Sequence, residues 1–184
     1  AIHGTAAFKG PHTITVNSQP ISADNFIIAT GAKPAIPDIP GKEYFSTSND
    51  FLSMPWLPKS ITFVGGGYVA IELANIAKVA GAHVNIIQHN HRILSKFPSE
   101  YTQKLAKLLA DRGIHFYWDT EVKHLAKADE RIKVQFAHDE IFTDMVVSAI
   151  GRPANVTNLG LADTGLDFSG KGIKVDDPLR TAAK

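Results

Sequence analysis

One short stretch of the sequence, residues 65–70, constrains the fold more than any other part of the chain. It consists of Gly-Gly-Gly-Tyr-Val-Ala, and it lies between a strand-like run at 60–64 and a segment with helical periodicity. Gly65, Gly67 and Ala70 match the pattern G-x-G-x-x-G/A, which binds a dinucleotide pyrophosphate between a strand and a helix. With a second strand at 82–88, the stretch predicts a βαβ unit with a dinucleotide site in preference to a purely structural glycine turn.

Each small residue of the pattern has an expected task. Gly65 permits the tight turn, Ala70 lets helix and strand pack closely, and Gly67 lets a pyrophosphate approach the backbone. The phosphates then meet free N–H groups at the positive end of the helix dipole. We expect a side chain at Gly67 to enter the pyrophosphate space and to strain the turn. The expected apolar face of the following helix is Val69, Leu73, Ile76, Ala77 and Ala80.

Composition narrows the class of protein. The 184 residues carry a net charge of +1, so no strong field favours nucleic acid or a membrane surface. No apolar run is long enough to span a bilayer, and no signal-peptide pattern opens the chain. The absence of cysteine excludes disulfide scaffolds, thiolate metal sites and cysteine nucleophiles within these residues. A cytoplasmic protein without nucleic-acid or membrane partners is the expectation.

The rest of the chain predicts an α/β protein. Short strands are expected over 6–28, and 25–31 predicts a buried strand that ends in Thr-Gly. Three prolines in 32–41 predict a stiff linker at a domain boundary. The remaining expected elements are a short helix within 46–57, a helix from a Ser99 cap to Gly113 with the apolar face Tyr101, Leu105, Leu108 and Leu109, a strand at 114–118, a meander over 121–125, 131–138 and 140–143, and a buried strand at 144–152.

Two strand ends share a pattern with the glycine stretch between them. Asp24 precedes Ala29-Thr30-Gly31, and Asp144 precedes Ala149-Ile150-Gly151-Arg152. In this order the motifs resemble the flavin-dependent pyridine nucleotide–disulfide oxidoreductases, such as glutathione reductase and dihydrolipoamide dehydrogenase. The resemblance extends over essentially the whole chain.

The resemblance implies a fold and a domain order. A Rossmann-like NAD(P)-binding domain, with a central parallel sheet and a β-meander, would occupy residues 41–153. Residues 1–40 and 154–184 would be partial segments of a second, FAD-binding domain. We therefore expect the chain to be an internal piece of a longer enzyme, in which the FAD pyrophosphate motif, a Cys-x4-Cys pair and a dimerisation domain lie outside these residues. The intact enzyme would be a homodimer.

The family also implies site residues. Tyr68 would cover the nicotinamide pocket, although it could be only an exposed aromatic side chain. Glu72 would lie near the nicotinamide carboxamide, unless it is only a solvated carboxylate. The implied NAD(P) contacts are Gly65, Gly66, Gly67, Tyr68, Val69, Glu72, Gln88, His89, His91, Arg92, Ser95, Ile150 and Gly151, and the implied FAD contacts of the intact enzyme are Ala6, Thr30, Gly31 and Arg152.

The coenzyme preference depends on the end of the second strand. An NAD enzyme normally carries Asp or Glu near the position of Gln88, and such a carboxylate would repel a 2′-phosphate. By the resemblance, His89 and Ser95 align with arginines that bind the 2′-phosphate, and His91 and Arg92 add basic groups. We expect NADP(H) to be favoured over NAD(H). A metal pair at His89 and His91 is a weaker alternative, because no cysteine or adjacent carboxylate completes it.

The predicted function is an NAD(P)H-binding domain of a flavoprotein disulfide reductase, which positions the nicotinamide for hydride transfer to FAD. No catalytic residue and no metal ligand is assigned within the chain. Two alternatives stay open. One is the corresponding domain of another FAD-dependent oxidoreductase, such as an NADH oxidase, a peroxidase or a ferredoxin reductase. The other is a nucleotide-binding fragment without catalysis of its own.

Overall fold

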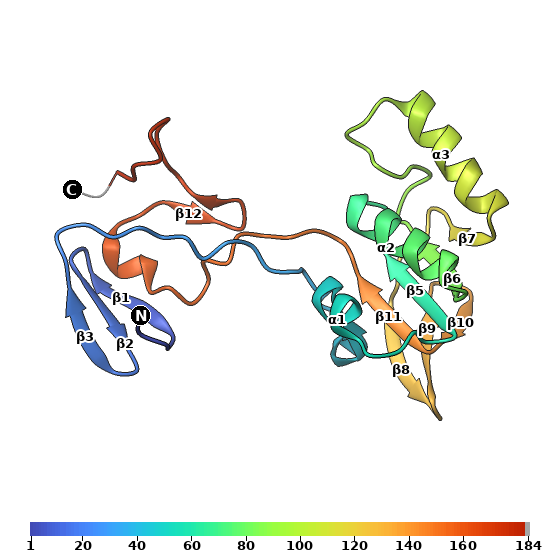
Figure 1. Ribbon diagram of the computed structural model, residues 1–184, viewed down its shortest axis with the longest axis horizontal. Coiled ribbons are helices and arrows are strands. Elements are labelled where there is room, and N and C mark those ends of the chain that lie inside the picture. Colours follow the sequence, from blue (N-terminus) through green and yellow to red (C-terminus); the bar gives the residue numbers. More distant parts are fainter. Residues whose placement is uncertain (183–184) are drawn as a thin grey trace. The chain divides into compact units, whose positions relative to one another are not determined.

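The computed structural model describes residues 1–182 and divides the chain into two compact units (Figure 1). The central unit is Pro34–Gly151, and the terminal unit combines Ala1–Lys33 with the chain from Arg152 onward. Two hydrogen bonds hold the proline-containing segment to the central unit: Ala35 N donates to Gly151 O at 3.0 Å, and Ser148 Oγ donates to Ala35 O at 2.6 Å. Which nucleotide each unit serves stays a prediction.

A five-stranded parallel sheet forms the middle of the central unit, which confirms the predicted α/β class. Its strand order is β4-β11-β5-β6-β7. The register aligns Val64 with Ile87 on one side and with Ser148 on the other. The strands are β4 (Phe45–Ser46), β5 (Ser60–Val64), β6 (His83–Ile87), β7 (Ile114–Tyr117) and β11 (Met145–Ser148).

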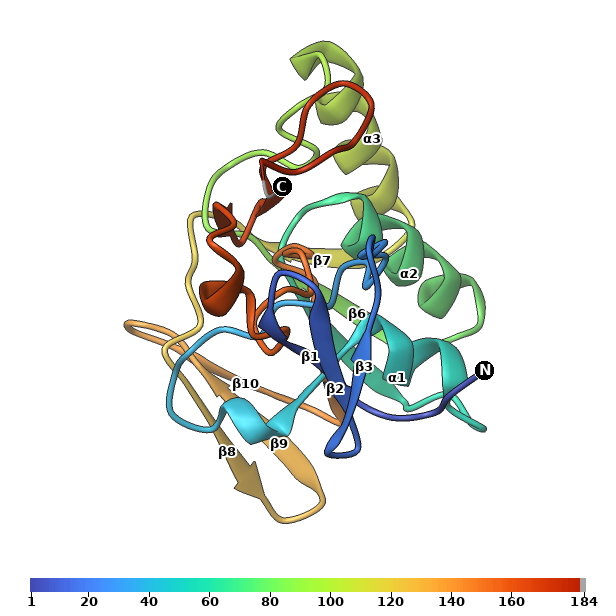
Figure 2. The ribbon, with the colours of Figure 1, turned by 90° about the vertical axis from the view of Figure 1, so that its left-hand side faces the viewer.

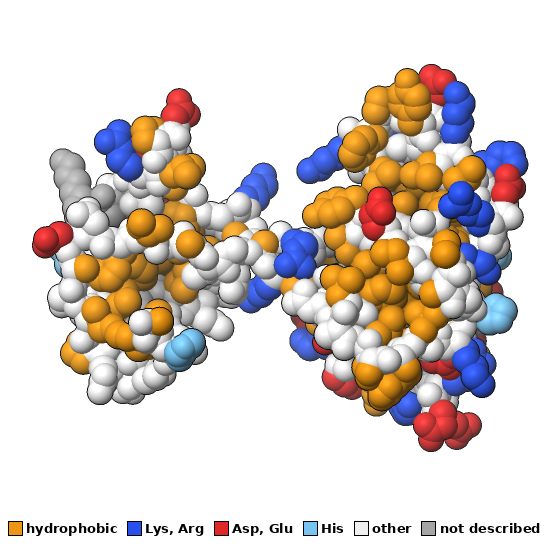
Figure 3. All heavy atoms as spheres, viewed as in Figure 1, with side chains coloured by type: hydrophobic (Ala, Val, Ile, Leu, Met, Phe, Trp, Pro, Cys, Tyr) orange, Lys and Arg blue, Asp and Glu red, His pale blue; other side chains and the backbone are white. Residues whose placement is uncertain are grey.

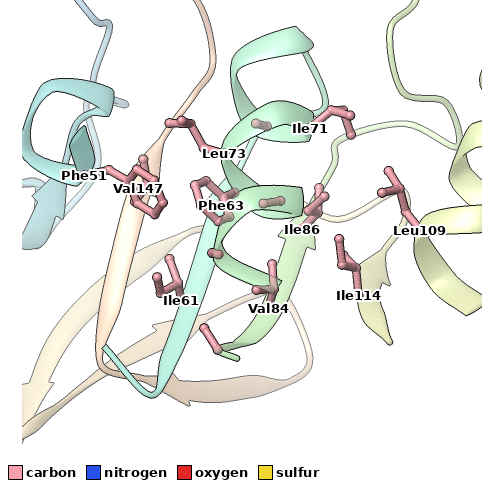
Figure 4. Close-up of a cluster of buried hydrophobic side chains, with 14 of the residues drawn as sticks. Phe51, Ile61, Phe63, Ile71, Leu73, Val84, Ile86, Leu109, Ile114 and Val147 are labelled. Atoms are coloured by element: carbon pink, nitrogen blue, oxygen red, sulfur yellow. The ribbon is translucent and has the colours of Figure 1, made fainter. Parts of the chain in front are cut away.

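Helices cover this sheet and enclose the larger core. They are α1 (Ser48–Ser53), α2 (Tyr68–Val79) and α3 (Ser99–Asp111), and a 3₁₀ turn, η1 (Lys42–Tyr44), precedes β4. Figure 4 shows the side chains of β5 and β6 directed toward α2, with Phe63 and Ile86 fully buried between them. Burial of each such side chain contributes about 1.5–3 kcal/mol. This core fixes α2 against the two strands whose ends form the candidate site.

The predicted apolar faces of α2 and α3 are partly wrong. In α2 the smallest side chains lie nearest the sheet, with Ala70, Ala74 and Ala77 fully buried, because they allow the closest approach of helix and strand. Ile76 is instead 52% exposed. Figure 3 shows hydrophobic side chains gathered on the surface of this unit over the region of α1 and α2. The exposed large hydrophobic residues of these helices and of the loop after α1 are Leu52, Trp56, Tyr68, Ile76 and Val79.

In α3, Leu109 is buried as predicted, whereas Tyr101 and Leu108 are exposed. Ser99 is the first helical residue, and Pro98 takes the N-cap position, so the expected serine cap is absent. Gly113 ends this region with φ 87°, a left-handed conformation that suits glycine, as predicted.

The predicted antiparallel meander is present and packs as a further layer, although its first strand lies at 124–128 and not at 121–125. Its strands are β8 (His124–Ala128), β9 (Arg131–Gln135) and β10 (Glu140–Thr143), in the order β10-β9-β8. Leu125 and Val134 are fully buried with Val146 of β11 in a separate core cluster. The meander therefore packs on the same sheet that carries the glycine stretch.

The terminal unit contains two small antiparallel sheets, and the three-stranded one is seen in Figure 2. Its core is small, with Phe8, Val156 and Leu161 buried. The elements are β1 (Ala6–Gly10), β2 (Thr13–Val16), β3 (Gln19–Ser22), the 3₁₀ turn η2 (Leu161–Thr164), β12 (Phe168–Ser169) and β13 (Gly172–Ile173).

The predicted buried strand at 25–31 is wrong for this structure. These residues form no strand, and Ile27 is 95% exposed. An apolar run forms a strand only where another strand pairs with it, and within residues 1–182 none pairs with this segment. No helix in the described part of the chain is long and apolar enough to cross a membrane.

Candidate functional site

The candidate site lies where the order of the parallel strands reverses. From β5 the chain proceeds to β6 and β7 on one side, whereas β11 and β4 lie on the other side of β5. In open α/β sheets, ligands bind beyond the carboxyl ends of the strands at such a switch point. The glycine stretch follows the carboxyl end of β5 at this point of the sheet.

Gly65 is fixed by its own backbone surroundings. Its N–H donates to Ile87 O at 2.8 Å, which ties the turn to β6. Its φ is 113°, and a Cβ at this position would lie 2.6 Å from Ala149 O. No side chain fits there, so the turn packs directly against the segment that follows β11. The predicted need for glycine at the turn therefore has a clear physical basis.

Gly67 occupies the N-cap of α2 and faces open space. It has no side-chain cap, and Ile71 N donates to Gly67 O at 3.1 Å, which leaves the earlier N–H groups of the helix without helical acceptors. A Cβ at Gly67 would meet nothing within 4 Å, and φ is −78°. The strain expected there is wrong, because this backbone suits any residue. The N-terminus of this twelve-residue helix has no side-chain cap and has free space in front of it, so it suits an anion.

Gln88, at the end of β6, is buried rather than displayed. It is 5% exposed, and its Nε2 donates to Asn90 Oδ1 at 3.0 Å and to Arg92 O at 2.8 Å. A Cβ on Gly66 would lie 2.8 Å from Gln88 Cδ, so the amide packs against the glycine loop. Gln88 Oε1 is buried without a hydrogen-bond partner. A buried acceptor in that condition costs about 1–3 kcal/mol unless a ligand or water donates to it.

The segment after Gln88 is ordered by its own hydrogen bonds. Asn90 Oδ1 accepts a bond from Arg92 N at 2.9 Å, and Leu94 N donates to Gly66 O at 2.8 Å. The Arg92 guanidinium donates to Phe97 O. The structure therefore joins the glycine loop and the segment 89–97, two parts that the sequence assigned to one site.

Carboxylates offset the basic groups of this segment. His91 Nδ1 lies 3.8 Å from Asp119 Oδ1. The hydrogen bond and charge of Lys123, with a further contribution from His89, hold the pKa of the Glu121 carboxyl below its ordinary value. Sequence reasoning missed both carboxylates, because they follow β7 and lie about 30 residues from the histidines in the chain. Within residues 1–182, no group of three or more His, Asp or Glu side chains could hold a metal ion.

The remaining predicted contacts of the central unit are solvent-accessible. Tyr68 is 66% exposed and Ile150 is 48% exposed, whereas Val69 is half-buried. Glu72, His89, His91, Ser95 and Gly151 are also exposed. Within the central unit, a Cβ on Gly65 would lie 3.2 Å from Ile150 N, so these two predicted site residues are brought together.

The predicted FAD contacts lie in the terminal unit. Asn155 joins two of them, since its N–H donates to Gly31 O at 2.9 Å and its Nδ2 to Thr30 O at 3.5 Å. Arg152 donates to Ala32 O at 3.1 Å, and Ala6 pairs with Val16 in the β1–β2 ladder. The structure thus brings Thr30 and Gly31 beside the chain that leaves the central unit, whereas Ala6 belongs to a separate sheet.

Comparison with known proteins gives one family. Residues 1–184 match the family described as pyridine nucleotide-disulphide oxidoreductase. Glutathione reductase of Burkholderia cepacia is 35% identical over 183 residues, which cover 98% of this chain and 40% of that protein. Mercuric reductase of Lysinibacillus sphaericus is 29% identical over 180 residues, which cover 95% of this chain and 33% of that protein.

A solved structure has the same fold. The HOCl-induced flavoprotein disulfide reductase RclA from Escherichia coli superposes with a TM-score of 0.92 at 26% identity, over 99% of this chain and 43% of that chain. The chain thus spans less than half the length of these similar proteins.

Proposed function

Because the chain belongs to the pyridine nucleotide-disulphide oxidoreductase family, we propose that its central unit binds NAD(P)H and orients the nicotinamide toward a flavin of the complete enzyme. Family membership implies FAD and a pyridine nucleotide as cofactors. The reduced nicotinamide supplies a hydride when bound. The residues of this chain bind and orient the dinucleotide.

One combined observation carries the proposal. The uncapped N-terminus of α2 opens into free space at Gly67, and beside the same loop the buried Gln88 Oε1 has no partner. The helix end offers N–H donors to a pyrophosphate, and the amide oxygen offers an acceptor to a hydroxyl group. A dinucleotide carries both groups, so these residues suit it.

We further propose that NADPH binds more tightly than NADH. No carboxylate occupies the position of Gln88, and the segment that follows it carries the exposed basic residues His89, His91 and Lys96. Asp119 and Glu121 oppose this basic character, so the preference should be a few-fold only.

For the complete enzyme, we propose reduction of a disulfide or a related acceptor by the flavin. The similar glutathione and mercuric reductases support this class of reaction. Thr30, Gly31 and Arg152 of the terminal unit, with Ala6, are the proposed flavin contacts. The thiol chemistry would need residues outside this chain, which contains no cysteine.

The central test is titration of the chain with NADPH and NADH, followed by nicotinamide fluorescence or calorimetry. Gly67→Val should lower the affinity for both by about 100-fold or more, since its methyl groups would occupy the space in front of the helix end. The fold should persist, because nothing in the protein lies within 4 Å of that Cβ.

Gly10→Val is the matched control. A Cβ at Gly10 would also meet nothing within 4 Å, and Gly10 belongs to the terminal unit, whereas the residues of the proposed site belong to the central unit. This variant should bind both dinucleotides like the parent chain. If folded Gly67→Val also binds like the parent chain, the glycine loop is not the phosphate site and the proposal fails.

A further inference from the structure

We propose that Gln88 is a positioning residue, which holds the segment 89–97 closed beside the glycine loop, and that this role requires an amide rather than a carboxylate. The inference deepens the proposed function and rests on it where dinucleotide binding is concerned. It concerns how the adenosine end of the site is shaped, not which group of the ligand is recognised.

The donor side of the Gln88 amide is fixed by its partners. Its Nε2 faces Asn90 Oδ1 at 3.0 Å and Arg92 O at 2.8 Å. Asn90 cannot turn its own amide over, because its Oδ1 also accepts the bond from Arg92 N at 2.9 Å. A main-chain carbonyl can only accept. Both partners therefore require a donor from residue 88.

The acceptor side of the same amide lies against the glycine loop. Gln88 Oε1 would be 3.1 Å from a Cβ on Gly66, and it is buried without a partner. Leu94 N makes a second tie to the same loop through Gly66 O. Gln88 thus fills the space between the glycine loop and the segment. Its Nε2 faces the segment, and its Oε1 faces the loop.

A glutamate in this place would meet two acceptors where Gln88 offers its Nε2, and no protein donor bonds the position of Oε1. One carboxylate oxygen would face the two acceptors, Asn90 Oδ1 and Arg92 O, and the other would take the unpartnered place beside Gly66. A carboxylate at this strand end is otherwise the usual means of favouring NADH. Gln88→Glu therefore separates two roles: a residue that selects the coenzyme, and a residue that positions the segment.

The experiment compares the full chain with three variants. Gln88→Glu replaces the donor Nε2 by an acceptor oxygen. Gln88→Met keeps the length of the side chain but removes both hydrogen bonds. Asn85→Asp is the matched control, since Asn85 is a partly buried amide on the same strand that bonds Thr62 Oγ1 outside this network. Hydrogen exchange of the 89–97 amides and the affinities for NADH and NADPH are measured for each.

We expect Gln88→Glu to speed exchange at Arg92 and Leu94 by about tenfold or more and to weaken NADH and NADPH alike by about tenfold, with their ratio unchanged. Gln88→Met should change both readouts in the same direction but less. Asn85→Asp should leave the segment's exchange and both affinities as in the parent chain.

Two results would overturn the proposal. One is a folded Gln88→Glu variant that binds NADH more tightly with unchanged exchange, which would make residue 88 a coenzyme selector. The other is unchanged exchange in both Gln88 variants. If the parent chain binds neither dinucleotide, the proposed function fails, but the exchange measurements still decide whether Gln88 holds the segment.

Discussion

The two walls of the candidate site are built in different ways. The glycine loop, residues 65–67, is shaped by close backbone packing, since a Cβ at Gly65 would strike Ala149 O. The adjoining wall, residues 88–97, is shaped by side-chain hydrogen bonds from Gln88 and Asn90. The first wall leaves little choice of residue at its turn, whereas the second can change with single substitutions. Substitutions in the second wall should therefore be able to change the coenzyme preference, whereas pyrophosphate binding should depend on the first wall.

The largest expected effect tests whether backbone packing fixes the first wall. Gly65→Ala should destabilise the fold by roughly 2–4 kcal/mol, because it combines φ 113° with a Cβ 2.6 Å from Ala149 O. Thermal unfolding followed by circular dichroism measures the change. Gly10→Ala is the control, and its free energy of unfolding should change by no more than about 0.5 kcal/mol. Equal midpoints for the two variants would show that the loop is not fixed in this way.

A second glycine in the same loop should behave in the opposite manner. Gly67→Ala should leave the unfolding midpoint nearly unchanged, since its φ is −78° and no atom lies within 4 Å of the added Cβ. Dinucleotide affinity should fall roughly 30-fold, which corresponds to about 2 kcal/mol of binding free energy. Fluorescence titration beside a melting curve separates the two effects. A large loss of stability at this position would erase the distinction between the two glycines.

These two glycines also show what a sequence can and cannot predict. The turn, the following helix and the second strand were predictable because the signal is local and repeats along the chain. The buried face of α2 was not predictable. Apolar residues occur on every side of this helix, so periodicity alone cannot choose between Ala74 and Ile76. Packing decides, and the small alanines approach the sheet most closely.

For the second wall, the sequence identified the residues but not their contacts. Gln88 was predicted to lie near the ligand, yet its burial depends on where Gly66 and Arg92 stand in space. Asp119 carried no signal, because only the pairing of β6 with β7 brings its loop near His91. The apolar segment at 25–31 was misjudged because a strand requires a partner that sequence periodicity cannot supply.

Asn90→Ala tests the second wall from its other end. The substitution removes the acceptor shared by Gln88 Nε2 and Arg92 N, so the affinities for NADH and NADPH should both fall by about five- to tenfold. The free energy of unfolding should change by about 1 kcal/mol at most. A double variant with Gln88→Met should lose less than the sum of the single losses, because both substitutions break one network. Strict additivity of the two losses would contradict a shared network.

The smallest expected effect concerns charge at the second wall. Asp119→Asn removes the carboxylate 3.8 Å from His91, so the ratio of NADPH to NADH affinity should rise by about two- to threefold at pH 6. The gain should shrink at high salt, because both side chains are exposed. Parallel titrations at low and high ionic strength give the measurement. A lower ratio in the variant would mean that Asp119 does not oppose the 2′-phosphate.

The division of the chain into a continuous central unit and a terminal unit made from two distant stretches has a kinetic consequence. Residues 34–151 can fold without waiting for either end of the chain, whereas the terminal unit must bring 1–33 together with residues from 152 onward. Closing so long a loop is entropically costly and slow. Once the bond between Ala35 and Gly151 has formed, the two stretches start side by side and that loop no longer has to be closed. Refolding should therefore proceed in order, with the central unit first and the terminal unit second.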